Sequence, residues 1–492
     1  MSRRTRSAET LGSYRGIHTG TDPLEATLNN TTSTITPTAK RAPSGAAPLR
    51  FRAGRWIDGW DAEDPGQWAR QGEAIARRNL RWSIFAEFLG FVVWQLWTIV
   101  VVQLPAAGFR LDTAQLFWLI SMPSLVGATL RVPYTFMVSR FGGRNWTVIS
   151  ALLLLIPSIG LAVCVSQPAT PFGVLLVIAG LAGFGGGNFA SSMANITFFY
   201  PARQKGWALG LNAAGGNLGA AVAQLAVPIA VSLTAAVTTG VSALPVAGLM
   251  WVPFIVIAAW GAYRYMDNLT DAQGDAAGAL AALKEPHLWV VAFLYIGTFG
   301  SFIGFSGVFP KLIKDLFPMY SAFTVGAAAL SLSFLGPLFG SLARPLRFGG
   351  ARITVLAFTA MSVTILAVIL TLPVKNFWLF LVLFLTLFTA SGIGNGSTYR
   401  MIPAIFARSS KAARAGATTR QTTRLASAAL GLVSAIGAYG GFIIPQLLGA
   451  SASLTGSYIS AFLGFLVAYL VMLAVTWVCY LRTAPSNAAA VV

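Results

Sequence analysis

The chain has 492 residues, of which 55% are hydrophobic and only 10% are charged. Because soluble domains contain about a quarter charged residues, this composition excludes a soluble globular protein and indicates a polytopic membrane protein. The formal net charge of +19 would suit nucleic-acid binding, but the basic residues recur in alternate loops between apolar runs, as they do where they orient membrane helices. We therefore expect a lipid bilayer around this chain and no nucleic acid.

Residues 1–80 precede the first apolar run and form a predicted N-terminal tail. Its first 50 or so residues are rich in Ser, Thr, Ala, Gly and Arg, a composition typical of disorder. The basic pair Arg3-Arg4 is not followed by the apolar stretch of an export signal, so no cleaved leader is predicted. The more aromatic segment from Trp56 to Ala76 is expected to dock on the membrane or on a partner.

Apolar runs of about 20 residues, enough to cross a bilayer core of about 30 Å, recur about twelve times. We predict spans at 81–104, 113–138, 145–166, 172–200, 205–233, 246–266, 287–309, 321–345, 351–373, 376–404, 424–448 and 456–481. They form two six-helix halves, 81–266 and 287–482, joined by the polar linker 267–286 and followed by a C-terminal tail at 483–492. The basic loops place the linker and both termini in the cytoplasm.

Two glycine-rich stretches with the same spacing occur, one in each half. The first has Gly183, Gly185 and Gly187 followed by Asn188, and the second has Gly392, Gly394 and Gly396 around Asn395. This duplication predicts an all-α polytopic membrane protein with the 12-helix major facilitator fold, built from two pseudo-symmetric halves. Packing is the ordinary role of any single glycine in a membrane helix. As a pair, the two runs are expected to lie on facing helices that approach closely.

An arginine is duplicated together with the glycines, as Arg131 in the first half and Arg344 in the second. A guanidinium near the bilayer centre is costly and normally faces a polar cavity or a partner. Snorkelling to the cytoplasmic surface is the alternative for each arginine. Since the predicted spans offer no obvious carboxylate partner, a small anion held in the planar forks of both arginines would neutralise them.

Aromatic residues suggest the shape of that anion. Tyr295 and Phe299 stand one helical turn apart and can face one cavity, while Phe189 projects from the first glycine run. Aromatic faces beside guanidinium groups suit a flat anion of delocalised charge, and Asn217 supplies an amide donor among small residues. Ordinary packing for the aromatic side chains, and a polar contact between helices for Asn217, are the alternatives.

The stretches Gly183–Pro201 and Gly392–Phe406 resemble the two nitrate signature motifs of the nitrate/nitrite porter family, the NarK-like branch of the major facilitator superfamily. The similarity extends over nearly the whole chain after the tail. It implies transport of nitrate and nitrite, with Arg131 and Arg344 clamping the anion and with Phe189, Asn217, Tyr295 and Phe299 sandwiching it or hydrogen-bonding to it. The chain departs from the family in a shorter turn after Arg344 and in an extra Arg400, a cytoplasmic anchor or an attractor of anions.

Glu87 is the one clear acidic residue inside a predicted span. Intramembrane carboxylates carry protons in many transporters, and so Glu87 is a candidate for proton coupling. Near the interface it could instead simply pair with Arg78 or Arg81. Proton/nitrate symport through Glu87 and nitrate/nitrite antiport without a titrating group both remain open.

Other classes of function find less support in the sequence. There is no nucleophile–base set, metal cluster or cofactor motif, so we expect neither an enzyme nor a bound metal or cofactor, and Cys164 and Cys479 are predicted to be packing residues. A carrier for another small anion is the nearest alternative, and an anion-binding membrane sensor is a remote one. We expect a monomer in the inner membrane of the cell.

Overall fold

A computed structural model describes residues 49–238, 242–272, 274–321, 324–329, 349–409 and 419–482. Eleven helices within these ranges are long and apolar enough to cross a membrane. The predicted span 321–345 lies largely outside the described residues, as do Arg344 and most of the N-terminal tail.

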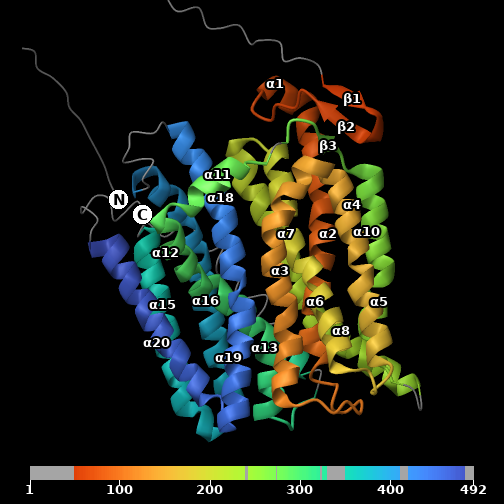
Figure 1. Cartoon of the computed structure of the whole chain (residues 1–492), viewed down its shortest axis with the longest axis vertical. Coiled ribbons are helices and arrows are strands. Elements are labelled where there is room, and N and C mark those ends of the chain that lie inside the picture. The colour runs from red at the N-terminus through yellow and green to blue at the C-terminus, as the bar shows by residue number, and fades with distance from the viewer. Residues whose placement is uncertain are drawn as a thin grey trace, which may run out of the picture. The chain divides into compact units, whose positions relative to one another are not determined.

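The first half contains helices that pack mainly on one another (Figure 1). They are α2 (Glu73–Val100), α3 (Thr113–Phe141), α4 (Gly143–Leu153), α5 (Leu155–Val165), α6 (Phe172–Leu181), α7 (Gly183–Phe199), α8 (Ala202–Val237), α9 (Val246–Leu249) and α10 (Val252–Tyr265). Several predicted spans are two helices in succession: α4 passes into α5, and α6 passes into α7 at Ala182, where the glycine run begins.

The second half repeats this pattern of broken spans. Its described elements are α11 (Ala276–Leu283), α12 (Pro286–Tyr295), η3 (Ile296–Gly300), α13 (Ser301–Leu316), α15 (Gly350–Thr371), η4 (Leu372–Val374), α16 (Phe377–Ser409), α18 (Thr419–Ala438), α19 (Gly440–Thr455), α20 (Ile459–Thr476) and η5 (Trp477–Arg482). The π-helical turn η3 interrupts the span α12–α13. Turns of this kind occur often at functional sites.

The first membrane helix begins earlier than predicted, because a cap rather than the apolar run determines its start. Asp64 accepts hydrogen bonds from the backbone N–H groups of Gly66 and Gln67, at 2.7 and 3.0 Å, and Pro65 occupies the first helical position. The helix then runs through α1 (Pro65–Gln67) and η2 (Trp68–Gly72) into α2. The predicted start at residue 81 is therefore wrong as a helix boundary.

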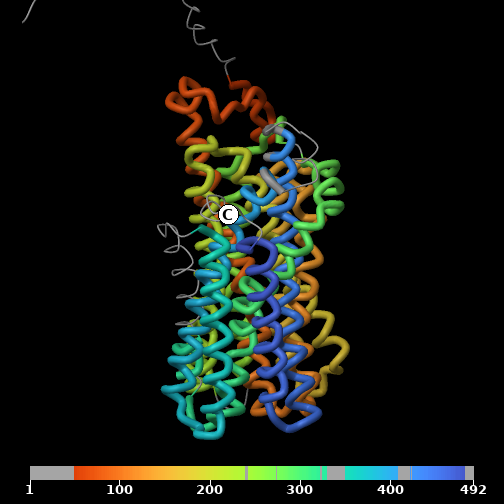
Figure 2. Tube along the Cα trace, turned by 90° about the vertical axis from the view of Figure 1, so that its left-hand side faces the viewer, coloured from red at the N-terminus to blue at the C-terminus, as the bar shows by residue number. Residues whose placement is uncertain are grey.

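Three short strands, which the sequence analysis did not predict, join the tail to the linker. Strand β1 (Arg50–Arg52) pairs antiparallel with β2 (Trp56–Asp58), and β2 pairs parallel with β3 (Asn268–Leu269) from the linker. The strands lie at one end of the helices in both views (Figures 1 and 2). The Trp60 indole N–H donates to the Phe198 carbonyl at 3.0 Å, so this segment docks on the chain's own helices. We refer to β1–β3 and α1 as the strand module.

The linker is fastened by ion pairs at its start and near its middle. The buried Asp267 carboxylate accepts hydrogen bonds from Arg55, Arg78 and Asn79, at 2.7, 2.7 and 2.9 Å. Farther along, Asp275 forms an ion pair with Arg424 of α18, and the hydrogen bond from that guanidinium lowers the pKa of Asp275. The start of the linker is thus tied to the first half and its middle to the second.

The first glycine run packs α7 against α2 and α3. A Cβ atom at Gly185 would lie 2.0 Å from the Gly90 carbonyl oxygen, and one at Gly183 would lie 2.7 Å from the Gly127 nitrogen. In the second run, a Cβ at Gly394 would lie 2.7 Å from Cγ2 of Thr298. Each run therefore packs within its own half at these positions. The prediction that the two runs face each other is wrong at these positions, because neighbours inside each half already occupy the space beside the glycines.

We predict that Gly185→Ala prevents normal folding, because the new methyl group would force the backbones of α7 and α2 apart. Gly210→Ala is the matched control, since a Cβ at Gly210 in α8 meets nothing within 4 Å. The measurement is the melting temperature and the monodispersity of each variant in detergent. A Gly185→Ala protein that melts like the parent would contradict the packing role of this run.

Candidate functional site

Arg131 lies in α3 between the two halves and is only 1% exposed. Its guanidinium carbon is 4.7 Å from the ring centre of Phe189 in α7, 5.4 Å from that of Phe299 in η3 and 5.9 Å from that of Trp94 in α2. Aromatic faces attract a cation, and more strongly where water is excluded. The guanidinium therefore occupies an aromatic cage to which both halves contribute.

Hydrogen bonds satisfy only part of this guanidinium. Nη1 donates to the carbonyl and the hydroxyl oxygen of Ser434 in α18, at 3.1 and 3.0 Å, and Nε donates to the Gly186 carbonyl at 3.3 Å. Nη2 is buried and has no hydrogen-bond partner in the part of the chain that the structure describes. A buried charged donor without an acceptor is costly. An anion at Nη2 would remove that cost.

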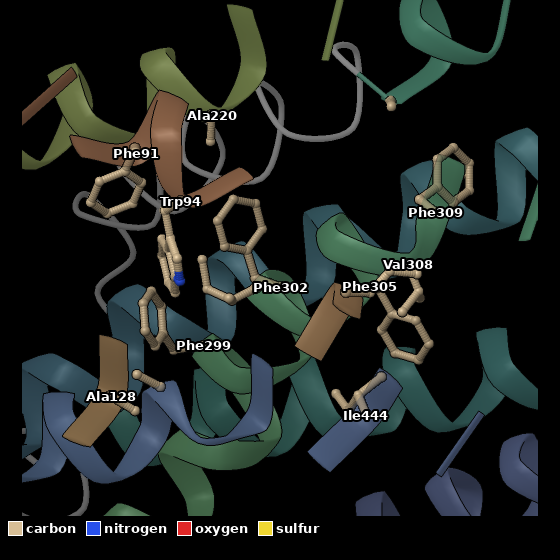
Figure 3. Packing of buried hydrophobic residues seen from close by; sticks show 14 of the residues in the cluster. Phe91, Trp94, Ala128, Ala220, Phe299, Phe302, Phe305, Val308, Phe309 and Ile444 are labelled. Carbon is tan, nitrogen blue, oxygen red and sulfur yellow. The ribbon is translucent and has the colours of Figure 1, made fainter. Parts of the chain in front are cut away.

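A second buried donor lies beside the first. The Trp94 side chain is 2% exposed, and its Nε1 likewise has no partner among the described residues. Glycines form the slot for its indole: a Cβ at Gly186 would lie 2.7 Å from Cε2, and one at Gly127 would lie 3.2 Å from Nε1. Figure 3 shows this indole and the Phe299 ring in the same buried cluster. Sequence reasoning missed Trp94, although a tryptophan inside a span, away from the interfacial belts, was an available signal.

The predicted aromatic pair of the second half has the expected arrangement. The rings of Tyr295 and Phe299 are stacked, with centroids 5.2 Å apart and planes 16° apart. Tyr399 of the second signature motif lies 5.8 Å from Tyr295. Gly437 in α18 makes room for this group, because a Cβ there would lie 2.3 Å from the Tyr295 ring. The stack thus lines the side of the Arg131 cage that belongs to the second half.

Other predicted residues lie elsewhere or outside the described residues. Arg344 is not among those described. Asn217 is half-buried in α8, and no hydrogen bond joins it to the described part of the chain. Asn188 is buried, and its side-chain oxygen accepts from the Ser191 hydroxyl at 2.8 Å. Within α16, Gly392 and Gly394 are buried, Asn395 and Gly396 are half-buried, and Arg400 is exposed.

Glu87 is fully buried in α2, and neither of its carboxylate oxygens has a hydrogen-bond partner among the described residues. It pairs neither with Arg78, which is bound to Asp267, nor with the exposed Arg81. The interpretation of Glu87 as half of an interfacial ion pair is therefore wrong. Asp267 in the linker, which is distant in sequence, binds Arg78 instead. Arg131 acts on the carboxylate electrostatically, and the Ser192 hydroxyl lies near enough to hydrogen-bond with it.

A seam between the halves runs along α3 and α19, from Arg131 toward the N-terminal end of α3. The hydroxyl groups of Thr129 and Tyr439 lie 2.9 Å apart, and the Gln446 amide donates to the Ser121 hydroxyl at 2.6 Å. The opposite end of α3, at Gly142, adjoins the strand module. In this conformation the halves therefore meet at the end of the molecule away from the strand module.

A cavity of about 580 Å³ lies near that same end, between α2, α8 and α13. Gln103, Gln224 and the exposed Lys314 contribute polar groups to its lining. The Gln224 amide nitrogen donates to the Thr98 hydroxyl oxygen at 3.4 Å. The rest of the lining is mainly apolar, and Lys314 is its one cationic side chain among the described residues.

Sequence and structure comparisons agree with this geometry. The Major Facilitator Superfamily profile matches residues 84–427, so the chain belongs to this superfamily of membrane transporters. Among solved structures, a bacterial homologue of the human lysosomal transporter Spinster, inward-facing and unoccupied, matches with a TM-score of 0.57 at 18% identity, over 82% of this chain and 96% of that one. A D-xylose–proton symporter matches with a TM-score of 0.59 at 14% identity, over 83% and 99%. The predicted fold class is confirmed.

Closer relatives define the branch within the superfamily. The chain is 42% identical to the nitrate/nitrite transporter NarU of Salmonella typhimurium, over 88% of this chain and 97% of that protein. It is 35% identical to a probable nitrate/nitrite antiporter, NarK2, of Thermus thermophilus, over 88% and 98%. The chain therefore belongs to the nitrate/nitrite transporter family, as its signature motifs indicated, and is a multi-pass membrane protein.

Proposed function

We propose that this chain transports nitrate and nitrite across the membrane by alternating access, with the Arg131 guanidinium holding the anion. The free Nη2 of a buried arginine, surrounded by three aromatic rings, is the observation that carries this proposal. A planar anion of delocalised charge can accept from Nη2 and stack on an aromatic face at the same time. The names of the relatives support the choice of anion.

The second half completes the site in this proposal. Phe299 and Tyr295 form its aromatic wall, and Phe189 faces them from the first half. Following the family resemblance, we assign Arg344 as the second guanidinium and Asn217 as an additional donor to the anion. One chain contains every group that the site needs, so the carrier functions as a monomer.

We assign the strand-module end to the cytoplasm of a cell whose inner membrane holds the protein. Basic residues gather at the helix ends on that side, Arg140, Arg144 and Arg264 among them, and clusters of Lys and Arg beside membrane spans remain on the cytoplasmic side. Both termini are then cytoplasmic. The seam along α3 and α19 lies on the outer side, where it holds the halves together in this conformation.

Alternating access requires that seam to open. The bonds from Arg131 to Ser434 and from Gln446 to Ser121 cross between the halves, so they break when the outer side separates. An anion at Nη2 keeps the guanidinium partnered during that change. Without the anion, Arg131 would lose an acceptor and gain none, so the empty carrier switches slowly. The anion-loaded carrier therefore changes conformation faster than the empty one.

Arg131→Lys should lower the rate of nitrate counterflow in reconstituted vesicles at least tenfold. A tenfold change corresponds to about 1.4 kcal/mol of free energy. An ammonium keeps the charge but loses the planar fork that donates to Ser434 and to the anion together. Arg140→Lys, an exposed substitution on the same helix, is the control. Near-normal nitrate affinity in a correctly inserted Arg131→Lys protein would remove the arginine from the site. Competition of formate and chloride with nitrate in the same assay tests the alternative that the chain carries another small anion.

Trp94→Phe should raise the dissociation constant for nitrate about tenfold, because it removes one hydrogen bond to a charged group and keeps an aromatic ring over Arg131. Trp97→Phe is the matched control. Trp97 is buried in the same helix, and its Nε1 also lacks a partner among the described residues. Calorimetric titration of both variants with nitrate measures the difference. Equal losses in the two variants would show that the Trp94 N–H does not reach the anion.

For energy coupling, we propose proton/nitrate symport through Glu87. A buried carboxyl group without a partner is stable in the membrane when it is neutral, and protonation makes it so. An acidic exterior alone should then concentrate nitrate in vesicles, and Glu87→Gln should abolish that accumulation. Under nitrate/nitrite antiport, uptake would instead require internal nitrite and would survive the substitution.

A further inference from the structure

Three helices of the first half bring together oxygen atoms that lack hydrogen-bond donors. Glu87 in α2 and Asn212 in α8 are both fully buried, and Ser192 in α7 is 6% exposed. Both carboxylate oxygens of Glu87 and the side-chain oxygen of Asn212 have no partner among the described residues. Three unpaired acceptors at one place are costly in an interior that excludes water.

Contacts between the helices place these residues together. The Asn212 amide nitrogen donates to the Ser192 hydroxyl oxygen at 3.0 Å. Gly216 lies one turn after Asn212 in α8, and a Cβ there would lie 3.1 Å from Cγ of Glu87. The Ser192 hydroxyl also lies near enough to the Glu87 carboxylate to hydrogen-bond with it. The three side chains therefore form one cluster, which we call the oxygen cluster.

Ser192 has one hydroxyl proton and cannot supply every missing donor. The hydroxyl can donate to the Phe189 carbonyl, at 3.1 Å, while its oxygen accepts from Asn212. Even when the hydroxyl donates to Glu87 instead, the second carboxylate oxygen and the Asn212 oxygen remain without donors. A water molecule could donate to two of the acceptors, but it would bring no positive charge to the carboxylate. A proton on Glu87 would supply one donor for one acceptor and leave another unpaired.

The charge near the oxygen cluster also requires a cation. Arg131 is the charged side chain that acts on Glu87 in the described part of the chain. The two charges balance when no anion is bound. An anion at Arg131 adds one negative charge, and one bound monovalent cation restores the balance.

We propose that Glu87, Asn212 and Ser192 form a binding site for one Na⁺ ion, which binds together with the anion. Hard cations prefer oxygen ligands, and this cluster offers a carboxylate, an amide carbonyl and a hydroxyl oxygen. Na⁺ and the proton compete for the same carboxylate, so the site extends the coupling role of Glu87. The inference rests on the proposed function, because the co-bound anion is the one held at Arg131.

The test is nitrate binding to the purified full chain, titrated in sodium, potassium or choline gluconate. At pH 8 we expect Na⁺ to lower the dissociation constant for nitrate about tenfold relative to choline. Protons and Na⁺ compete for the same carboxylate, so the effect should be smaller at pH 5.5 than at pH 8. Identical dissociation constants in all three salts at pH 8 would overturn the Na⁺ site, and so would an equal effect of K⁺.

Substitutions locate the effect. Asn212→Leu and Ser192→Ala should each reduce the Na⁺ dependence of nitrate binding, and Glu87→Gln should eliminate it. Ser191→Ala is the matched control, because Ser191 is also buried in the preceding position but bonds to Asn188 instead. Unchanged Na⁺ dependence in Asn212→Leu would overturn the assignment of the ligands. Nitrate counterflow by the parent chain in sodium gluconate tests the proposed function separately, so failure of the cation site leaves that function standing.

Discussion

Burial of one guanidinium is the constraint on which this structure depends. A cation removed from water costs several kcal/mol unless acceptors and polarisable groups surround it. The chain surrounds Arg131 with a serine, a backbone carbonyl and three aromatic rings taken from four other elements. These groups satisfy two of its three nitrogens. The third nitrogen, Nη2, requires an acceptor that the described residues do not supply. In a transporter that acceptor can be the transported anion.

The glycines serve this burial indirectly. Membrane helices gain little from hydrophobic burial against each other and rely on close packing of small residues. Gly186 and Gly127 leave the space that the Trp94 indole occupies, and Gly437 leaves the space for Tyr295. The site is asymmetric as a result: the first half supplies both unpaired donors, while the second supplies stacked rings and the Ser434 oxygens. The asymmetry between the two signature motifs is the sequence counterpart of this division.

Features that depend on local spacing could be predicted from the sequence, and features that depend on distant pairing could not. The Tyr295–Phe299 stack follows from helical periodicity, and Arg131 was evident from its place in an apolar span. Arg78, in contrast, was a reasonable partner for Glu87 from the sequence. In the structure Arg78 pairs with Asp267, which lies far along the chain. Strands of two or three residues carry no periodic pattern, so the strand module left no signal. Trp94 was overlooked because its role depends on glycines in two other helices.

The first half contains buried hydrogen-bond donors without acceptors and, near them, buried acceptors without donors. Arg131 and Trp94 are donors without acceptors, while Glu87 and Asn212 are acceptors without donors. Direct pairing of Glu87 with Arg131 would satisfy both, yet no hydrogen bond joins them in the part of the chain that the structure describes. Because these groups do not pair with each other, a mobile anion can bind the donors and a mobile cation can bind the acceptors. Since each bound ion compensates the charge of the other, the binding of one strengthens the binding of the other, and coupling needs no moving part between the two sites.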